Sequence, residues 1–154
     1  MDRIKLTKNL YLDEYMPTDV YKKYGAKCAR LIDSRVVAID QAFRDRYGII
    51  FINMPGLLEN RGFRPISYYV KKGQLYSQSQ HKYGRASDKH FKDVTVDEVY
   101  IDILKSPKKW IELGMTTVEN IRFTHKDKTT TGWLHTDCRM PESAYVGKIR
   151  IVNP

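Results

Sequence analysis

The sequence predicts an α+β fold with a mostly antiparallel sheet, because helical patterns come first along the chain and strand-like segments cluster late. The clearest helical pattern spaces apolar residues from Ile32 to Tyr47 by four, three, four and four, and Gly48 follows this stripe where a helix is expected to stop. Residues 118–123, 132–139 and 145–152 have the composition of strands.

Further elements complete this prediction. Residues 49–52 form a short β-branched and aromatic run that is typical of a buried strand. Thr95 and Glu98 have the spacing of a capping box at the start of a helix, which Pro107 ends or interrupts before a second short helix. Residues 60–93 show little periodicity, so we expect long loops around short strands there, and loops of that length are usually functional.

The size and composition fit a single globular domain spanning residues 1–154. The chain has 154 residues, of which 42% are hydrophobic and 29% charged, and this length is sufficient for a buried core. No apolar run approaches the ~20 residues that a membrane-spanning helix needs. The first residues lack the pattern of a secretory signal. Cys28 and Cys138 are too few for a disulfide framework and are expected to be reduced thiols.

Positive charge is concentrated in one part of the chain. The whole chain carries a net charge of +9, and residues 61–92 contain eight Lys or Arg residues against one acidic residue, Asp88, which gives +7 for this segment. Such a field favours a polyanionic partner: nucleic acid, an anionic wall polymer or an acidic peptide. A solvated basic surface without such a partner accounts for the charge equally well.

Two of the four histidines lie in segments that favour metal chemistry. His81 and Asp88 flank Gly84, which can adopt positive φ, so a turn there would bring the imidazole and the carboxylate together. His135 lies in a strand-like segment in which Asp137 shares its face. Two imidazoles and a carboxylate suit a catalytic zinc ion, which keeps its fourth position for water. The alternative is that each histidine is a hydrogen-bonded core residue.

Both histidine segments resemble motifs of the zinc D-Ala-D-Ala carboxypeptidases and phage L-alanyl-D-glutamate endopeptidases, a group that also includes the hedgehog signalling domain and lysostaphin-type enzymes. The first motif is Ser-x-His-x-x-Gly-x-Ala-x-Asp, and each defined position matches between Ser79 and Asp88. The second is Trp-Leu-His-Thr-Asp, which begins at Trp133. Gly62-Phe63-Arg64-Pro65 resembles an upstream Gly-Tyr-Arg-Ser-Pro element, with Phe for Tyr and no Ser. Residues 6–15 resemble the amino-terminal segment of phage-encoded members.

The resemblance covers about residues 60–139 and implies a hedgehog/DD-peptidase-like fold. The zinc ligands would be His81, Asp88 and His135. Arg64 falls where the family has an arginine that holds a substrate carboxylate or stabilises an oxyanion, and its planar, permanently charged group suits both tasks; an ordinary surface arginine is the alternative. Ser79 would hydrogen-bond a ligand or order its loop, and Trp133 would line the substrate groove or belong to the core.

The general base is the position where this sequence departs from the family. Several relatives have an acidic residue three positions before the last zinc histidine, but here that position is Gly132. Other members have the acid two positions after it, and Asp137 fits that version, ~6.6 Å along an extended strand from His135. Asp137 is therefore either the base or a hydrogen-bond acceptor that fixes the tautomer of His135. His125 and Asp127, in the loop before the last motif, are further candidates, and the alternative for both is a solvated loop.

These features favour a zinc-dependent peptidase that cuts peptidoglycan stem peptides, either as a carboxypeptidase that removes a terminal D-Ala or as an endopeptidase. The missing signal and the phage-like opening favour a phage or prophage endolysin, made in the cytoplasm and acting at the bacterial cell wall, where the basic segment would adsorb to an anionic polymer. A non-catalytic zinc-containing wall-binding module is the alternative, supported by Gly132. Nucleic-acid binding ranks last because it leaves both histidine motifs unexplained. A monomer is favoured.

Overall fold

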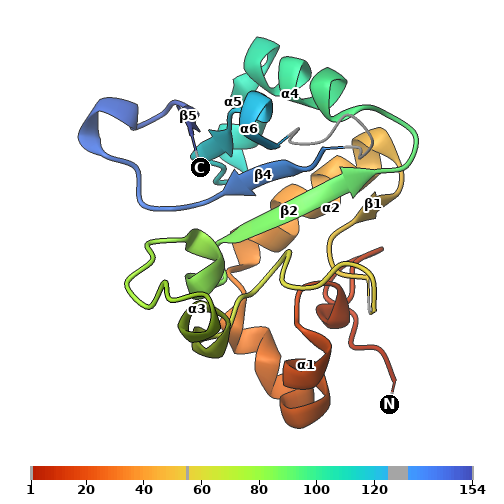
Figure 1. Cartoon of the computed structure of the whole chain (residues 1–154). Helices are drawn as coiled ribbons and strands as arrows, with labels where there is room; N and C mark the ends of the chain where they lie inside the picture. Colours follow the sequence, from red (N-terminus) through yellow and green to blue (C-terminus); the bar gives the residue numbers. More distant parts are fainter. Residues whose placement is uncertain (1, 55, 125–131, 154) are drawn as a thin grey trace.

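The computed structural model describes residues 2–54, 56–124 and 132–153. Its strands are β1 (Ile50–Phe51), β2 (Ala86–Phe91), β3 (Thr117–Glu119), β4 (Leu134–Asp137) and β5 (Arg150–Val152). They form a five-stranded sheet in the order β1-β2-β4-β3-β5 (Figure 1). The β1–β2, β2–β4 and β3–β4 pairs are antiparallel, whereas β3 and β5 run parallel. The predicted α+β class with a mostly antiparallel sheet is therefore confirmed.

The described residues also form six α-helices around this sheet. They are α1 (Thr18–Tyr24), α2 (Ser34–Tyr47), α3 (Ile66–Lys71), α4 (Val96–Lys105), α5 (Pro107–Glu112) and α6 (Ile121–Thr124). Figure 1 shows α2 lying behind β2, with α4 and α5 on the side of β4 away from β2. Among the described ranges, no helix is both long and apolar enough to cross a membrane.

Helix α2 is the predicted early helix, and it anchors the core. Asp33 caps its first turn by accepting a hydrogen bond from the backbone N–H of Arg35, and the helix stops at Gly48, whose φ is +80°. Its buried side chains include Phe43, which stacks on Trp110 of α5 with ring centroids 4.3 Å apart. The apolar face of α2 therefore packs toward the sheet, as the spacing of its apolar residues predicts.

Two other sequence signals are confirmed. Thr95 and Glu98 make a reciprocal capping box before α4, in which the Thr95 hydroxyl accepts from the backbone N–H of Glu98 and the Glu98 carboxylate accepts from the backbone N–H of Thr95. Pro107 occupies the first turn of α5, where its missing N–H costs nothing. The cysteines Cys28 and Cys138 are buried free thiols.

The predicted late strands are longer than those in the structure. The prediction of a strand over residues 118–123 is wrong beyond Glu119, where β3 ends. The Asn120 side chain accepts a hydrogen bond from the backbone N–H of Arg122, which starts α6. A strand over residues 145–152 is also wrong in its first half. The chain there leaves a 3-10 turn and bends at Gly147, whose φ is +71°, before β5 begins.

β2 is the main element that the sequence does not predict. Residues 60–93 are expected to be loops around short strands, yet they contain α3 and the six-residue β2, which lies between β1 and β4. β2 reads Ala-Ser-Asp-Lys-His-Phe and has no alternation of apolar and polar residues. Its Asp88 faces one side of the sheet, whereas Ser87 and Lys89 contact Asp40 of α2 on the other. Polar contacts on both faces explain why no strand pattern is visible.

Candidate metal centre

Three buried side chains from three separate elements meet at one point. His81 lies on the 3-10 helix η3 (Gln80–Tyr83), Asp88 on β2 and His135 on β4, and each residue is at most 4% exposed. His81 Nε2 lies 3.1 Å from Asp88 Oδ1 and 3.2 Å from His135 Nδ1. His135 Nδ1 lies 2.7 Å from the same Asp88 oxygen. The structure thus brings together the three predicted ligands in a group that could hold a metal ion.

A glycine turn and the strand register position these three residues. Gly84 ends η3 with a φ of +65°, and a Cβ atom at this position would lie 1.7 Å from the carbonyl oxygen of Leu31. Only glycine satisfies both conditions, so the predicted turn between His81 and Asp88 is confirmed. Asp88 and His135 are direct partners in the antiparallel β2–β4 pair, which places their side chains on one face.

The segment before α3 runs beside the cluster and is bonded to it through backbone atoms. The Arg61 carbonyl accepts from the backbone N–H of Asp88 (2.7 Å), and the backbone N–H of Arg64 donates to the His81 carbonyl (3.0 Å). Between them, Gly62 passes so close to Tyr15 that an added Cβ atom would lie 2.4 Å from its carbonyl oxygen. The glycine is therefore needed for the arginines on either side to reach the cluster.

The donor atoms of the cluster and the neutral form of His81 fit a zinc ion. Ligand atoms ~2.0–2.1 Å from a tetrahedral zinc lie ~3.3–3.4 Å from one another, which is more than the 3.1, 3.2 and 2.7 Å separations in the cluster, so a bound ion would hold the three atoms farther apart. His81 Nδ1–H donates to the Gly62 carbonyl (2.6 Å), which leaves the Nε2 lone pair toward the cluster, and burial lowers the pKa of His81 and favours this neutral form. Burial opposes ionisation of Asp88, but the two histidines outweigh it and hold the pKa of Asp88 well below its usual range.

Asp137 lies on the side of the His135 ring that points away from the other two ligands. Its Oδ2 atom is 3.4 Å from His135 Nε2, and Arg139 Nε donates to both of its oxygens at 2.9 Å. Burial favours a neutral His135 ring, yet hydrogen bonds to Asp137 and Asp88 raise the pKa of His135 to about 10. Of the two roles predicted for Asp137, this geometry favours the acceptor that orients the ring.

Two arginines approach the second oxygen of Asp88. Arg64 Nη2 donates to Asp88 Oδ2 (2.6 Å), and its Nε donates to the carbonyl of Asn60 (2.6 Å). Arg61 is farther away, with Nη1 3.6 Å from the same oxygen, and its guanidinium lies over the Trp133 ring at 4.7 Å. Arg64 therefore holds the carboxylate of a predicted ligand, a contact that the sequence motif does not predict.

The cluster opens into a cleft of about 850 Å³. Ser79 and Trp133, the other two residues predicted at the site, both line it. Four arginines from different parts of the chain line it as well: Arg61, Arg64, Arg139 and Arg150. A guanidinium group in this cleft that is not hydrogen-bonded to a protein acid could bind an anionic ligand beside the candidate metal centre.

Glu119 is an acidic residue of the cleft that the sequence does not predict. It ends β3, lines the cleft, and places Oε1 3.9 Å from His135 Nδ1 with 16% of its side chain exposed. Burial raises the pKa of Glu119, which suits a carboxylate that accepts a proton. Glu119 reaches the cleft because β3 pairs with β4, and no local sequence pattern predicts this. The other predicted candidates for the base, His125 and Asp127, lie outside the described residues.

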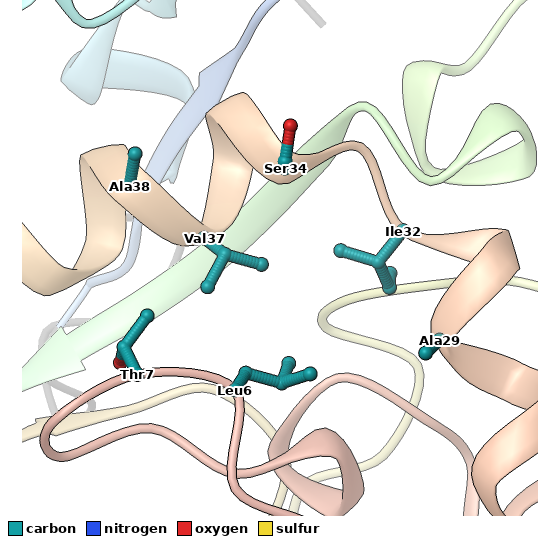
Figure 2. Close-up of a pocket in the computed structure, with 7 residues that line it drawn as sticks. All are labelled: Leu6, Thr7, Ala29, Ile32, Ser34, Val37 and Ala38. Atoms are coloured by element: carbon teal, nitrogen blue, oxygen red, sulfur yellow. The ribbon is translucent and has the colours of Figure 1, made fainter.

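A second, smaller cavity lies between the amino-terminal segment and α2 (Figure 2). Its volume is about 270 Å³, and it is lined mainly by the apolar side chains of Leu6, Ile32 and Val37. None of its described lining residues is acidic, basic or a histidine. This cavity therefore offers no metal ligand and no charged group among its described lining residues.

Comparison of the chain with family models, with curated proteins and with solved structures gives no match. The likeness to zinc peptidases therefore depends on the sequence motifs and on the site geometry described above.

Proposed function

We propose that this protein is a zinc-dependent peptidase that hydrolyses a peptide bond in the stem peptides of bacterial peptidoglycan. The observation that carries the proposal is the buried cluster of His81, Asp88 and His135 at the floor of a cleft. Two histidines and one carboxylate, with an open fourth position, are a donor set of catalytic zinc sites. The two histidine motifs, which resemble those of cell-wall peptidases, support peptidoglycan as the substrate.

The fold that we propose with this function is the hedgehog/DD-peptidase-like fold that the motifs imply. Its support is the arrangement of the ligands on the mostly antiparallel sheet: Asp88 and His135 are register partners on neighbouring strands, and His81 comes from the turn that precedes β2. The motif residues thus occupy one site although 54 positions separate the two histidines.

The reaction needs a Lewis acid and a proton acceptor. When bound, zinc would acidify water toward a pKa of ~7 and polarise the peptide carbonyl. Glu119, which lines the cleft with Oε1 3.9 Å from His135 Nδ1, would take up the proton of the attacking water at its carboxylate and return it to the leaving amine. Asp137 keeps the His135 ring oriented with Nδ1 toward the cluster, and Arg64 holds Asp88 by its second oxygen.

The alternative function is a zinc-containing wall-binding module without turnover. Gly132 supports it, because it stands where several relatives have an acid, whereas Glu119 supports catalysis by supplying an acid from another strand. In either case we propose action at the bacterial cell wall as part of phage or prophage lysis. The exposed lysines of the basic segment, among them Lys71 and Lys72, would assist adsorption to an anionic wall polymer.

Digestion of purified peptidoglycan tests the proposed function. The zinc-loaded protein is incubated with the wall material with and without a chelator, and mass spectrometry identifies the released fragments and therefore the bond cut. We expect stem-peptide cleavage that stops with the chelator and is absent in His81→Ala. The control is His90→Ala, which changes a histidine of β2 that is not part of the cluster. Zinc-dependent wall binding without cleavage would favour the binding module.

A further inference from the structure

Three of the four arginines in the cleft already donate to protein acceptors. Arg64 donates to Asp88 and to the carbonyl of Asn60. Arg139 donates to Asp137, and Arg150 donates to Glu142. Each of these guanidinium groups therefore has an acidic partner, and together they leave little uncompensated positive charge in the cleft.

Arg61 differs from the other three. Among the residues that the structure describes, its guanidinium has no hydrogen-bond acceptor: Asp88 is its nearest acid, at 3.6 Å. The group is nevertheless held in place, because it lies over the Trp133 ring, 4.7 Å from the ring centre. The Arg61 backbone is fixed as well, since its N–H donates to the Asn53 side chain (2.8 Å).

This arrangement prepares Arg61 to bind a ligand. Stacking on an aromatic ring occupies the face of the guanidinium and leaves the N–H donors at its edge, where a carboxylate can accept two parallel hydrogen bonds. The side chain is 22% exposed and lines the cleft, so part of it is accessible to substrate. A pre-positioned donor group loses little side-chain entropy when a ligand binds.

We propose that Arg61 and Trp133 form a carboxylate-binding subsite beside the metal centre, which selects peptides that carry a free acidic group near the scissile bond. The inference rests on the proposed peptidase function and names the substrate class more narrowly: acidic stem peptides are preferred to amidated ones. Arg61 thereby adds to Arg64, to which the sequence motif assigns substrate binding and whose Nη2 and Nε donors also hold Asp88 and Asn60.

A carboxylate fits this subsite better than a phosphate chain. Nucleic acids and phosphate-containing wall polymers present rows of negative charges and are bound by several unpaired cations. Among the described lining residues, Arg61 is the one arginine without a hydrogen-bonded acid: it lies 3.6 Å from Asp88, whereas Arg64, Arg139 and Arg150 donate to Asp88, Asp137 and Glu142. A single guanidinium fork matches a single carboxylate.

Two matched peptides test the proposal by binding. One is a stem pentapeptide with its free D-glutamate and terminal carboxylates, and the other has both groups amidated. Titrating each into the zinc-free full-length protein avoids hydrolysis, and the fluorescence of Trp133 and calorimetry report binding. We expect the acidic peptide to bind the wild-type protein roughly ten- to a hundredfold more tightly than the amide. This preference should disappear in Arg61→Gln. Trp133→Phe identifies the fluorescence signal, since the other tryptophan, Trp110, is buried in the core.

Kinetics on the zinc-loaded protein separate failure of the subsite from failure of the proposed function. Arg61→Gln should raise KM for the acidic peptide roughly ten- to a hundredfold with little change in kcat. Arg85→Gln, which removes an exposed arginine that does not line the cleft, should leave both unchanged.

Cleavage of the acidic and the amidated peptide with equal efficiency by the wild-type protein would overturn the subsite and leave the peptidase function intact. No cleavage and no binding of either peptide would overturn the proposed function. Stronger competition by inorganic phosphate than by acetate would overturn the assignment of carboxylate.

Discussion

The Nε2 atom of His135 lies 3.4 Å from Oδ2 of Asp137, while Nδ1 of the same ring faces His81 and Asp88 in the candidate metal centre. One imidazole thus joins a metal-binding position to a buried carboxylate on its opposite edge. An acceptor at Nε2 keeps the proton there and the Nδ1 lone pair available to a metal. Asp137 would therefore act on a bound metal ion through His135, because it contacts the edge of the ring that points away from the other two candidate ligands.

Asp137→Asn should weaken zinc binding by ~10–100-fold, because an amide orients the ring less strongly than a carboxylate. Activity should return when excess zinc is supplied. Competition with a chromogenic chelator measures the affinity. Asp45→Asn, an exposed aspartate of α2, is the control and should bind zinc normally. Normal zinc affinity with activity lost at every zinc concentration would instead identify Asp137 as the general base.

Glu119→Gln should leave zinc affinity unchanged and lower kcat by ~10²–10⁴-fold, because an amide cannot accept the proton. The side chain lines the cleft 3.9 Å from His135, so the substitution changes little besides charge. Steady-state kinetics on a defined stem peptide, with zinc content measured in parallel, give both values. Glu112→Gln, an exposed glutamate of α5, should behave as wild type. Unchanged kcat in Glu119→Gln would exclude this residue as the proton acceptor.

Arg64→Ala should lower both zinc affinity and turnover. The sequence motif alone predicts a loss of turnover, of roughly a hundredfold to a thousandfold, through a lost oxyanion or carboxylate contact. The hydrogen bond from Arg64 to Asp88 adds a loss of zinc affinity of about tenfold or more, because the ligand carboxylate is no longer oriented. Zinc titration and kinetics at saturating zinc measure the two effects separately. Unchanged zinc affinity would show that the Asp88 contact does not orient the ligand.

Lys89→Met should destabilise the protein by about 3–5 kcal/mol, because it leaves the buried carboxylate of Asp40 without its cation. Lys89 and Asp40 are both 0% exposed, and Nζ lies 3.1 Å from Asp40 Oδ1 and 2.7 Å from Thr136 Oγ1. Adding Asp40→Leu should restore much of the lost stability, since no unpaired charge remains. Urea unfolding measures these changes, with exposed Lys92→Met as the control. Equal stability of Lys89→Met and wild type would contradict this account.

Gly84→Ala should destabilise the protein far more than Gly73→Ala. Both glycines have nearly the same positive φ, +65° and +66°, so both substitutions carry the backbone penalty of roughly 1–2 kcal/mol. Only at Gly84 does the new Cβ atom meet backbone, 1.7 Å from the Leu31 carbonyl oxygen. The displaced turn should also weaken zinc binding through His81. Urea unfolding and zinc titration of the two variants check this, and similar stabilities would contradict it.

The sequence by itself determined the elements whose signals are local. The apolar stripe of α2 with Gly48, the Thr95–Glu98 capping box and the glycine turn at Gly84 depend on residues that are near one another in the chain. The two histidine motifs likewise identified the three residues of the cluster, because their spacing is a local pattern.

Only the tertiary structure decided the position of β2 and the surroundings of the cluster. Both faces of β2 make polar contacts. Its sequence therefore lacks the alternation of apolar and polar residues that marks a strand. Glu119 reaches the site through β3–β4 pairing, and Arg61 differs from the other three arginines only because those donate hydrogen bonds to acids in the folded chain. Strand pairing and ion pairing join residues that are distant in sequence, so no local spacing encodes them.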